Sequence, residues 1–484
     1  VMPIEKLVIN ISIKISAESI LNITTIHFST ELTIMNLSKL MAPPPPKPLL
    51  PKEQIDKVYK ASRYRVFSSI FIGYMGYYLV RNSTSVLSGI LDMSATEIGI
   101  ISCAGFLAYG ISKFVSGLIS DRSNSKIFLS LGLFLSGLVN LLIGAIPGIV
   151  TSVMLFTIMY LINGWIQGMG YPPGARTLVF WYDRKERISW ATAWNLSHNV
   201  GGALAPILIG LSFAFAGDSA VEQAQMGFII PGIVCMAMSV LIYFLQLDTP
   251  ASVGLPSVEE WRSGEKTKEV ISEPPSVKSI ISEHIVGNTK LLYCCIHGAF
   301  IYILRYGIVA WAPKFLSAPV EIGGKGLSKL SSMGGFSVFE IGGVAGMMLA
   351  GLISVKIFKN SKPLTNVLFL LVTIILLWAY WMIPAGVEYQ SLNYFILICL
   401  GLSIYGPVMF IGLYSMELVP KHVAGAASGL TGTFSYLFGS IVATLGMGVI
   451  VDNYGWDATF MLLIGSAVMA IVTTVLSRDK SLEF

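Results

Sequence analysis

The chain has 484 residues, of which 54% are hydrophobic and 12% are charged, and its formal net charge is +5. Soluble globular domains carry about 25% charged residues, so this composition excludes a protein whose whole surface faces water. Apolar runs near or above the roughly 20 residues that cross a bilayer recur along most of the chain. The sequence therefore predicts an all-α membrane protein surrounded by membrane lipid.

Two kinds of partner are excluded by the distribution of particular residues. Lysines and arginines do not gather among exposed aromatic residues, so no nucleic-acid partner is expected. The cysteines lie in apolar segments without the spacing of metal ligands, and no metal or other cofactor is expected. They are Cys103, Cys235, Cys294, Cys295 and Cys399.

Residues 1–63 differ in composition from the rest of the chain and are expected to form an N-terminal extension. Residues 1–40 are rich in Ile, Thr and Ser, begin with Val, and precede plausible starts at Met35 and Met41. They lack the basic region, compact apolar core and cleavage site of a signal peptide. We interpret them as a disordered tail or an over-extended gene start. Prolines 43–46 and a basic segment follow, and this segment is expected in the cytoplasm.

From about residue 64, the apolar runs predict twelve transmembrane helices in two halves of six. A polar, proline-containing linker at 247–289 separates an N-terminal half at 64–246 from a C-terminal half at 290–476, and a tail follows at 477–484. The expected helices are 64–86, 96–119, 126–146, 150–179, 189–214, 227–246, 290–312, 330–356, 364–383, 391–416, 422–450 and 456–476.

Alternate connections between these helices are basic, whereas the others are nearly free of Lys and Arg. The positive-inside rule then predicts that both termini and the long linker lie in the cytoplasm. Only the connection between the seventh and eighth helices departs from the pattern, because it carries Lys314, Lys325 and Lys329.

Ionisable residues inside the apolar segments are the candidate functional residues. Arg81 follows Tyr77-Tyr78-Leu79-Val80 in the first half, and Arg305 follows Tyr302-Ile303-Leu304 in the second. A buried arginine keeps its charge and costs at least about 2.5–3.5 kcal/mol within a bilayer. Lys113, His198 and Glu340 lie in other helices. Four potential cations against one carboxylate predict an anion, held between the halves by the two guanidinium groups.

Each of these residues also has a structural interpretation. The arginines could extend to the membrane interface, and Lys113 could pair with Asp121 instead of binding substrate. His198 could be a packing residue, and Glu340 is expected to be a charge partner of a basic group rather than a proton carrier. Asp121 and Arg122 are expected to form a cytoplasmic latch between helix ends. The small residues and prolines at 164–174 are expected to bend the fourth helix.

Several long sequence motifs together resemble those of the organophosphate:phosphate antiporter family of the major facilitator superfamily. They are YYLVR, AYGISKFVSGLISDRS, NGWIQGMGYPPGART, WNLSHNVGG, DTPASVGLP, LRYGIVAWAP, IYGPVMFIGLYSMELVPK and GWDATF. The resemblance implies that Arg81 and Arg305 grip a phosphate and that Lys113 and His198 lie near it. It also implies that further residues line the path, namely Tyr74, Tyr78, Trp194, Asn195, Tyr302, Tyr405 and Tyr436.

The C-terminal half resembles the glycerol-3-phosphate branch of this family. That resemblance implies exchange of an organic phosphate for inorganic phosphate, by a monomer in a bacterial inner membrane. Asn82 and Ala310 depart from the branch, which has a lysine and an acidic residue at these positions. A hexose-6-phosphate carrier and a membrane sensor acting on a kinase remain alternatives. No HExxH site, nucleophile elbow or Walker A loop points to an enzyme.

Overall fold

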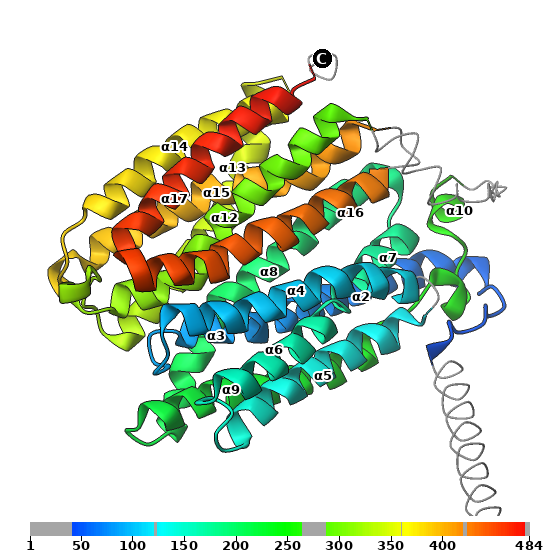
Figure 1. The fold of residues 1–484 in the computed structure, drawn as a ribbon. Coiled ribbons are helices and arrows are strands. Elements are labelled where there is room, and N and C mark those ends of the chain that lie inside the picture. The colour runs from blue at the N-terminus through cyan, green and yellow to red at the C-terminus, as the bar shows by residue number, and fades with distance from the viewer. Residues whose placement is uncertain (1–40, 121–122, 264–286, 360, 420–423, 480–484) are drawn as a thin grey trace, which may run out of the picture.

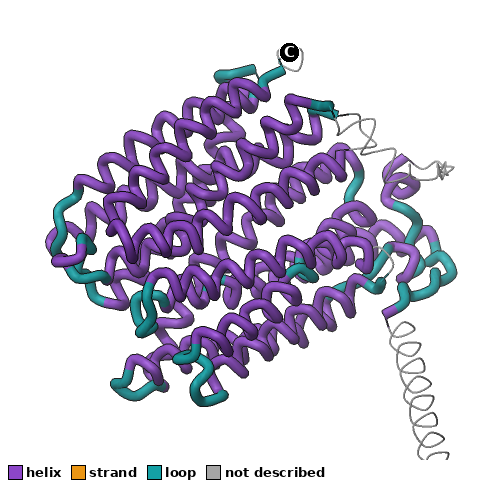
Figure 2. The backbone as a smooth tube through the Cα atoms, in the orientation of Figure 1, coloured by secondary structure: helices purple, strands orange, loops and turns teal. Residues whose placement is uncertain are grey.

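The structure is a computed structural model that describes residues 41–479 except 121–122, 264–286, 360 and 420–423 (Figure 1). In these described residues the secondary structure is helical and contains no strand (Figure 2). The extension at 1–40 and the proposed latch of Asp121 and Arg122 lie outside the described residues.

The N-terminal half begins with a long helix that carries Arg81 as its last residue. Its helices are α2 (Lys52–Arg81), α3 (Ser83–Leu87), α4 (Ala95–Ser120), α5 (Ser125–Ala145), α6 (Val153–Gln167), α7 (Tyr171–Trp181), α8 (Arg184–Ser212) and α9 (Ala220–Leu245). The short helix α10 (Val258–Ser263) follows in the linker. Because α2 starts well before the expected residue 64, the basic segment is part of the first helix.

The C-terminal half repeats this arrangement and lies beside the first half (Figure 1). Its helices are α12 (Thr289–Ser317), α13 (Lys329–Lys356), α14 (Lys362–Met382), α15 (Gln390–Glu417), α16 (Ala424–Phe434) and α17 (Met447–Ser477). Two π-helical stretches, Ser435–Ser440 and Val442–Gly446, join α16 to α17.

The expected twelve-helix bundle is confirmed, although its helices are divided differently. Among the described residues, 10 spans are long and apolar enough to cross a membrane. One of these, Ala427–Ser477, contains two crossings, because Gly455 has a φ of 77° and interrupts the helix. These spans therefore supply eleven crossings, and the more polar helix α2 is the twelfth.

The fourth crossing is broken where the small residues predict a bend. Helix α6 ends at Gln167, and α7 begins at Tyr171 with prolines in its first turn. A Cβ on Gly164 would collide with the backbone carbonyl of Gly105, so this glycine allows α6 to approach α4 closely. The break leaves Gln167 at the end of α6, beside α2.

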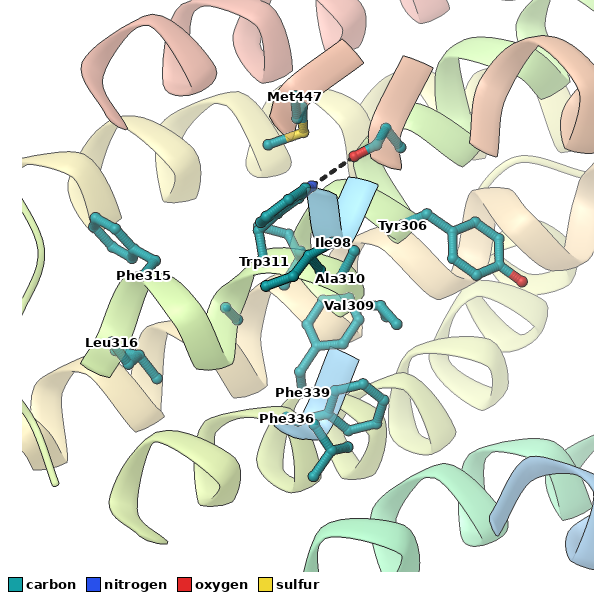
Figure 3. Close-up of a cluster of buried hydrophobic side chains, with 14 of the residues drawn as sticks. Ile98, Tyr306, Val309, Ala310, Trp311, Phe315, Leu316, Phe336, Phe339 and Met447 are labelled. Atoms are coloured by element: carbon teal, nitrogen blue, oxygen red, sulfur yellow. Dashed lines mark hydrogen bonds between the residues drawn. The ribbon is translucent and has the colours of Figure 1, made fainter. Parts of the chain in front are cut away.

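At one end of the bundle, which carries α3 and which we call the α3 end, the two halves share a core (Figure 3). Ile98 of α4 packs in the same buried cluster as Trp311 and Met447 of the C-terminal half. The indole N–H of Trp311 donates to the carbonyl of Ala443 at 2.8 Å. This end of the molecule is therefore closed.

Two of the three lysines that break the charge pattern bind backbone carbonyls at the α3 end. Lys314 donates from Nζ to the backbone carbonyl of Met93 in the other half at 2.6 Å. The buried Lys325 donates to the carbonyl of Ile383. These ammonium groups satisfy backbone acceptors, so their positions reflect folding contacts and do not contradict the orientation predicted from the other loops.

The opposite end, which we call the α10 end, is held by ion pairs and by the start of the linker. Arg176 of α7 pairs with Asp248 at 2.6 Å, and Arg63 of α2 pairs with Glu186 of α8 at 2.5 Å. In α10, Trp261 stacks on Tyr59 with ring centroids 4.3 Å apart. The first part of the linker is therefore packed against the N-terminal half.

Candidate functional site

Arg81 is held in a fixed orientation at the end of α2. Its Nε donates to Oε1 of Gln167 at 3.0 Å, and Gln167 in turn donates to Ser136 and to the carbonyl of Tyr77. The guanidinium carbon lies 4.3 Å from the ring centroids of both Tyr78 and Tyr109. Such contacts favour a cation. The atoms Nη1 and Nη2 are buried and have no hydrogen-bond partner.

Arg305 occupies the corresponding place in α12 but is anchored through a tyrosine. Its Nε donates to the hydroxyl of Tyr405 at 3.2 Å, and this hydroxyl donates to Glu340 at 2.5 Å. Asn199 of α8 donates from Nδ2 to the other oxygen of Glu340 at 2.8 Å. Glu340 is thus linked to Arg305 through Tyr405, and its carboxylate also joins the two halves.

His198 connects the surroundings of the two arginines. Its ring centroid lies 5.3 Å from that of Tyr78 and 6.1 Å from that of Tyr405. Tyr78 contacts Arg81, and Tyr405 contacts Arg305, whose guanidinium carbon lies 4.8 Å from the Tyr405 ring. The side chains therefore form a continuous row from one arginine to the other. The buried Nε2 of His198 has no partner.

Lys113 belongs to an aromatic cluster on the Arg81 side of this row. Its Nζ lies 4.5 Å from the ring centroid of Tyr171 and 5.6 Å from that of Tyr436. The Tyr436 ring also lies 4.8 Å from Tyr109 and 5.1 Å from Tyr302. Tyr436 and Tyr302 come from the C-terminal half, so this cluster also spans both halves.

The remaining expected residues form a neighbouring group on α2 and α8. Trp194 is almost fully buried, and its Nε1 donates to the carbonyl of Ile70 at 3.1 Å. Its ring packs against Tyr74, which also contacts Tyr78. Asn195 is partly exposed one helical turn before His198. Trp194 has the contacts of a packing residue, while Tyr74 joins this group to the row between the arginines.

Sequence reasoning missed four residues that contact the site. Tyr109 lies four positions before Lys113, a spacing that places both on one helix face, so this signal was available. Asn199 directly follows His198, and Tyr306 directly follows Arg305. Gln167 gave no signal, because an amide within a glycine-rich helix resembles a packing residue.

The charges of the site suit an anion. Arg81, Arg305 and Lys113 are cationic, and Glu340 already accepts hydrogen bonds at both oxygens. Within the described part of the chain, no group of three potential metal ligands occurs. The unpartnered Nη atoms of Arg81 can donate two parallel hydrogen bonds to an oxyanion.

Comparison with known proteins agrees with this fold. The Major Facilitator Superfamily pattern matches residues 66–444, and the chain belongs to this superfamily. A bacterial homologue of the human lysosomal transporter Spinster, solved in an inward-facing and occupied conformation, has a TM-score of 0.64 at 13% identity and covers 87% of this chain and 97% of that one. At this identity the likeness concerns the fold alone.

Two curated relatives indicate the branch within the superfamily. The glycerol-3-phosphate transporter of Haemophilus influenzae is 39% identical over 87% of this chain and 92% of its own length. The probable hexose phosphate transport protein of Chlamydia pneumoniae is 36% identical, again over 87% and 92%. These relatives confirm the resemblance to the organophosphate:phosphate antiporter family that the sequence motifs indicated.

Proposed function

We propose that this protein exchanges an organic phosphate ester, glycerol-3-phosphate in the first instance, for inorganic phosphate across a bacterial inner membrane. The observation that carries the proposal is the row of side chains between Arg81 and Arg305. Each half contributes one guanidinium group, and His198 stands between their tyrosine partners. A phosphate bound to both arginines would draw the halves together.

Alternating access follows from this placement. The α3 end is closed, so the bound anion would leave toward the α10 end, which the positive-inside rule predicts to face the cytoplasm. When the halves rock, the α3 end opens and the α10 end closes around the same site. Without an anion, two guanidinium groups would remain unneutralised in a site that excludes water, which raises the barrier to reorientation. Exchange is therefore favoured over one-way transport.

A hexose-6-phosphate is the second candidate for the organic substrate. The similarity to the Chlamydia pneumoniae protein favours it. Both candidates use the same phosphate contacts and differ only in the group attached to the phosphate. The somewhat higher identity to the Haemophilus influenzae protein supports glycerol-3-phosphate as the first choice.

The experiment is phosphate exchange in proteoliposomes made with the purified protein. Vesicles loaded with inorganic phosphate should take up labelled phosphate, and vesicles without internal phosphate should take up little. External glycerol-3-phosphate should compete at lower concentration than glucose-6-phosphate. Rapid uptake into phosphate-free vesicles would exclude obligatory exchange, and stronger competition by glucose-6-phosphate would select the second candidate.

A further inference from the structure

Cationic and aromatic side chains meet at the α10 end of the N-terminal half, where α2, α5 and α9 pack together. Arg65 of α2 donates from Nε and Nη2 to the carbonyls of Leu245 and Phe244, the last two residues of α9. Lys126, the second residue of α5, places its Nζ 4.1 Å from the ring centroid of Tyr243. We call Arg65, Lys126, Tyr243 and Phe244 the interfacial cluster.

The interfacial cluster lies at the edge of the apolar part of the bundle. The spans Ser125–Ala145 and Ala220–Leu245 are long and apolar enough to cross a membrane, and the cluster takes the first turn of one and the last turn of the other. Tyr243 and Phe244 are 41% and 64% exposed. Exposed aromatic side chains at the end of a transmembrane helix are typical of the membrane interface. The cluster is therefore expected at the level of the lipid headgroups.

The chain does not neutralise the two cations of this cluster. Among the described residues, no carboxylate forms an ion pair with Arg65 or Lys126. Asp248, which follows α9, is buried and is engaged by Arg176 at 2.6 Å. Backbone carbonyls and an aromatic face attract a cation but do not remove its charge. The cluster thus presents two positive charges at the interface.

The C-terminal half has a cation at the position that corresponds to Arg65, but this cation is paired. In the first helix of each half, Arg65 and Lys290 stand about four helical turns before Arg81 and Arg305 respectively. Lys290 forms an ion pair with Asp479, just beyond the end of α17, at 2.6 Å. In the N-terminal half, Arg65 reaches only the carbonyls that end α9.

The position that corresponds to Lys126 shows the same difference. In the third crossing of each half, Lys126 and Lys362 lie in the first turn of helices of 21 residues. Lys362 forms an ion pair with Glu417 at 2.6 Å, whereas Lys126 contacts the exposed ring of Tyr243. Both cations of the C-terminal half therefore have a carboxylate of the chain, and both cations of the interfacial cluster need an anion from outside it.

We propose that the interfacial cluster binds the phosphodiester headgroup of an anionic phospholipid. The ammonium group of Lys126 and the Nη1 of Arg65, which the α9 carbonyls do not use, bind the phosphate oxygens. The acyl chains cover Tyr243 and Phe244, which a free phosphate ion would leave uncovered. Basic groups at the cytoplasmic ends of transmembrane helices attract anionic lipids, and the positive-inside rule predicts that this end faces the cytoplasm.

The bound lipid has a structural effect that is independent of the transported substrate. It contacts α2, α5 and α9 together, so it stabilises the packing of these helices as Glu417 and Asp479 stabilise the corresponding end of the C-terminal half. Anionic lipid should therefore raise the thermal midpoint of the protein whether or not the proposed exchange function is correct.

Thermal stabilisation of the detergent-purified protein by added lipid tests this proposal. The probe is phosphatidylglycerol, and phosphatidylcholine with the same acyl chains shows the effect of a lipid without net charge. Inorganic phosphate shows the effect of a free anion. Lys126→Gln removes one charge of the cluster, Lys126→Arg keeps it, and Lys362→Gln removes the corresponding charge of the C-terminal half.

Phosphatidylglycerol should stabilise the unsubstituted protein at lower concentration than phosphatidylcholine. Lys126→Gln should weaken the apparent affinity for phosphatidylglycerol by about fivefold. Lys126→Arg and Lys362→Gln should each change it by less than about twofold. If Lys126→Gln does not fold, Lys126→Met, which keeps an apolar stem at this position, decides by the same comparison.

Three results would overturn the proposal. The first is equal stabilisation of the unsubstituted protein by the two lipids. The second is an equal change of phosphatidylglycerol affinity in Lys126→Gln and Lys362→Gln. The third is stabilisation by inorganic phosphate that Lys126→Gln abolishes, which would assign the cluster to a free anion. None of these results bears on phosphate exchange, which the transport assay tests separately.

Discussion

Asp452 of the C-terminal half accepts hydrogen bonds from the backbone N–H groups of Thr96, at 2.6 Å, and of Ala95, at 3.1 Å, at the start of α4 in the N-terminal half. The first N–H groups of a helix lack partners within it, and they carry a partial positive charge. The carboxylate therefore stabilises the end of α4 and joins the halves at once. This contact must break whenever the α3 end opens.

Asp452→Asn should shift the protein toward the state that is open at the α3 end. The amide offers one acceptor and no charge, and loss of a helix cap costs about 0.5–2 kcal/mol. A change of about 1 kcal/mol alters the ratio of closed to open molecules about fivefold. Spin labels at the exposed positions Asp218 and Val387, one in each half, report this ratio as a distance distribution.

Asp457→Asn is the matched control for this measurement. Asp457 accepts a hydrogen bond from the indole of Trp381 at 2.7 Å, and both residues belong to the C-terminal half. Its substitution should leave the distance distribution unchanged. Identical distributions for Asp452→Asn and the unsubstituted protein would show that the cap does not control opening.

Tyr405→Phe should weaken binding of inorganic phosphate by about tenfold. The hydroxyl of Tyr405 separates Arg305 from Glu340, and without it the carboxylate can pair directly with the guanidinium group and compete with the anion. The double variant Tyr405→Phe/Glu340→Gln should recover part of the affinity, because the competing charge is gone. Equilibrium binding of labelled phosphate measures both effects.

Tyr380→Phe serves as the control for the loss of a buried hydroxyl. The Tyr380 hydroxyl has no hydrogen-bond partner, and its ring packs against Phe315 and Phe460. Phosphate affinity should not change in this variant. A double variant that binds more weakly than Tyr405→Phe alone would contradict competition by Glu340.

The two arginines could be predicted from the sequence because a charge in an apolar run is conspicuous and because the residues that precede each arginine are similar. The residues that orient the arginines could not be predicted in this way. Gln167 and Asn199 are neutral amides, and only the packing of α6 against α2 and of α8 against α13 gives them their roles. Sequence periodicity also cannot show which lysines bind backbone carbonyls far away in the sequence. The alternation of basic and non-basic loops therefore could not account for Lys314 and Lys325.

Asp248→Ala should strongly destabilise the α10 end. The carboxylate is buried, pairs with Arg176 at 2.6 Å and accepts from the N–H and hydroxyl of Ser125 at 2.8 Å each. Removing it leaves the largely buried guanidinium group of Arg176 with its hydrogen bond to the Ser123 carbonyl but without its charge partner, at a cost of about 3–5 kcal/mol. The thermal midpoint of the purified protein should fall clearly. Asp56→Ala, which breaks an exposed ion pair with Lys60, should cost less than about 1 kcal/mol. Equal falls in the thermal midpoint for the two variants would show that the Arg176–Asp248 pair stabilises the protein no more than an exposed pair does.

The contact of α10 with the bundle should depend on pH through Glu186. This carboxylate accepts from Arg63 at 2.5 Å and from Arg262 at 3.0 Å. Burial raises the pKa of Glu186, but the hydrogen bonds and charges of the two arginines outweigh it, and the pKa lies below the ordinary value of 4.5. A carboxylate whose pKa is lower in the folded protein stabilises it above the ordinary pKa, and this contribution is lost as the pH falls through the folded-state pKa.

Glu186→Gln should therefore lower the thermal midpoint at about pH 7, and the gap from the unsubstituted protein should narrow as the pH falls below 4.5. Glu259→Gln, on the exposed side of α10, should show a smaller gap at every pH. A gap for Glu186→Gln that stays constant down to about pH 3.5 would mean that packing, such as the stacking of Trp261 on Tyr59, holds α10 without the ion pair.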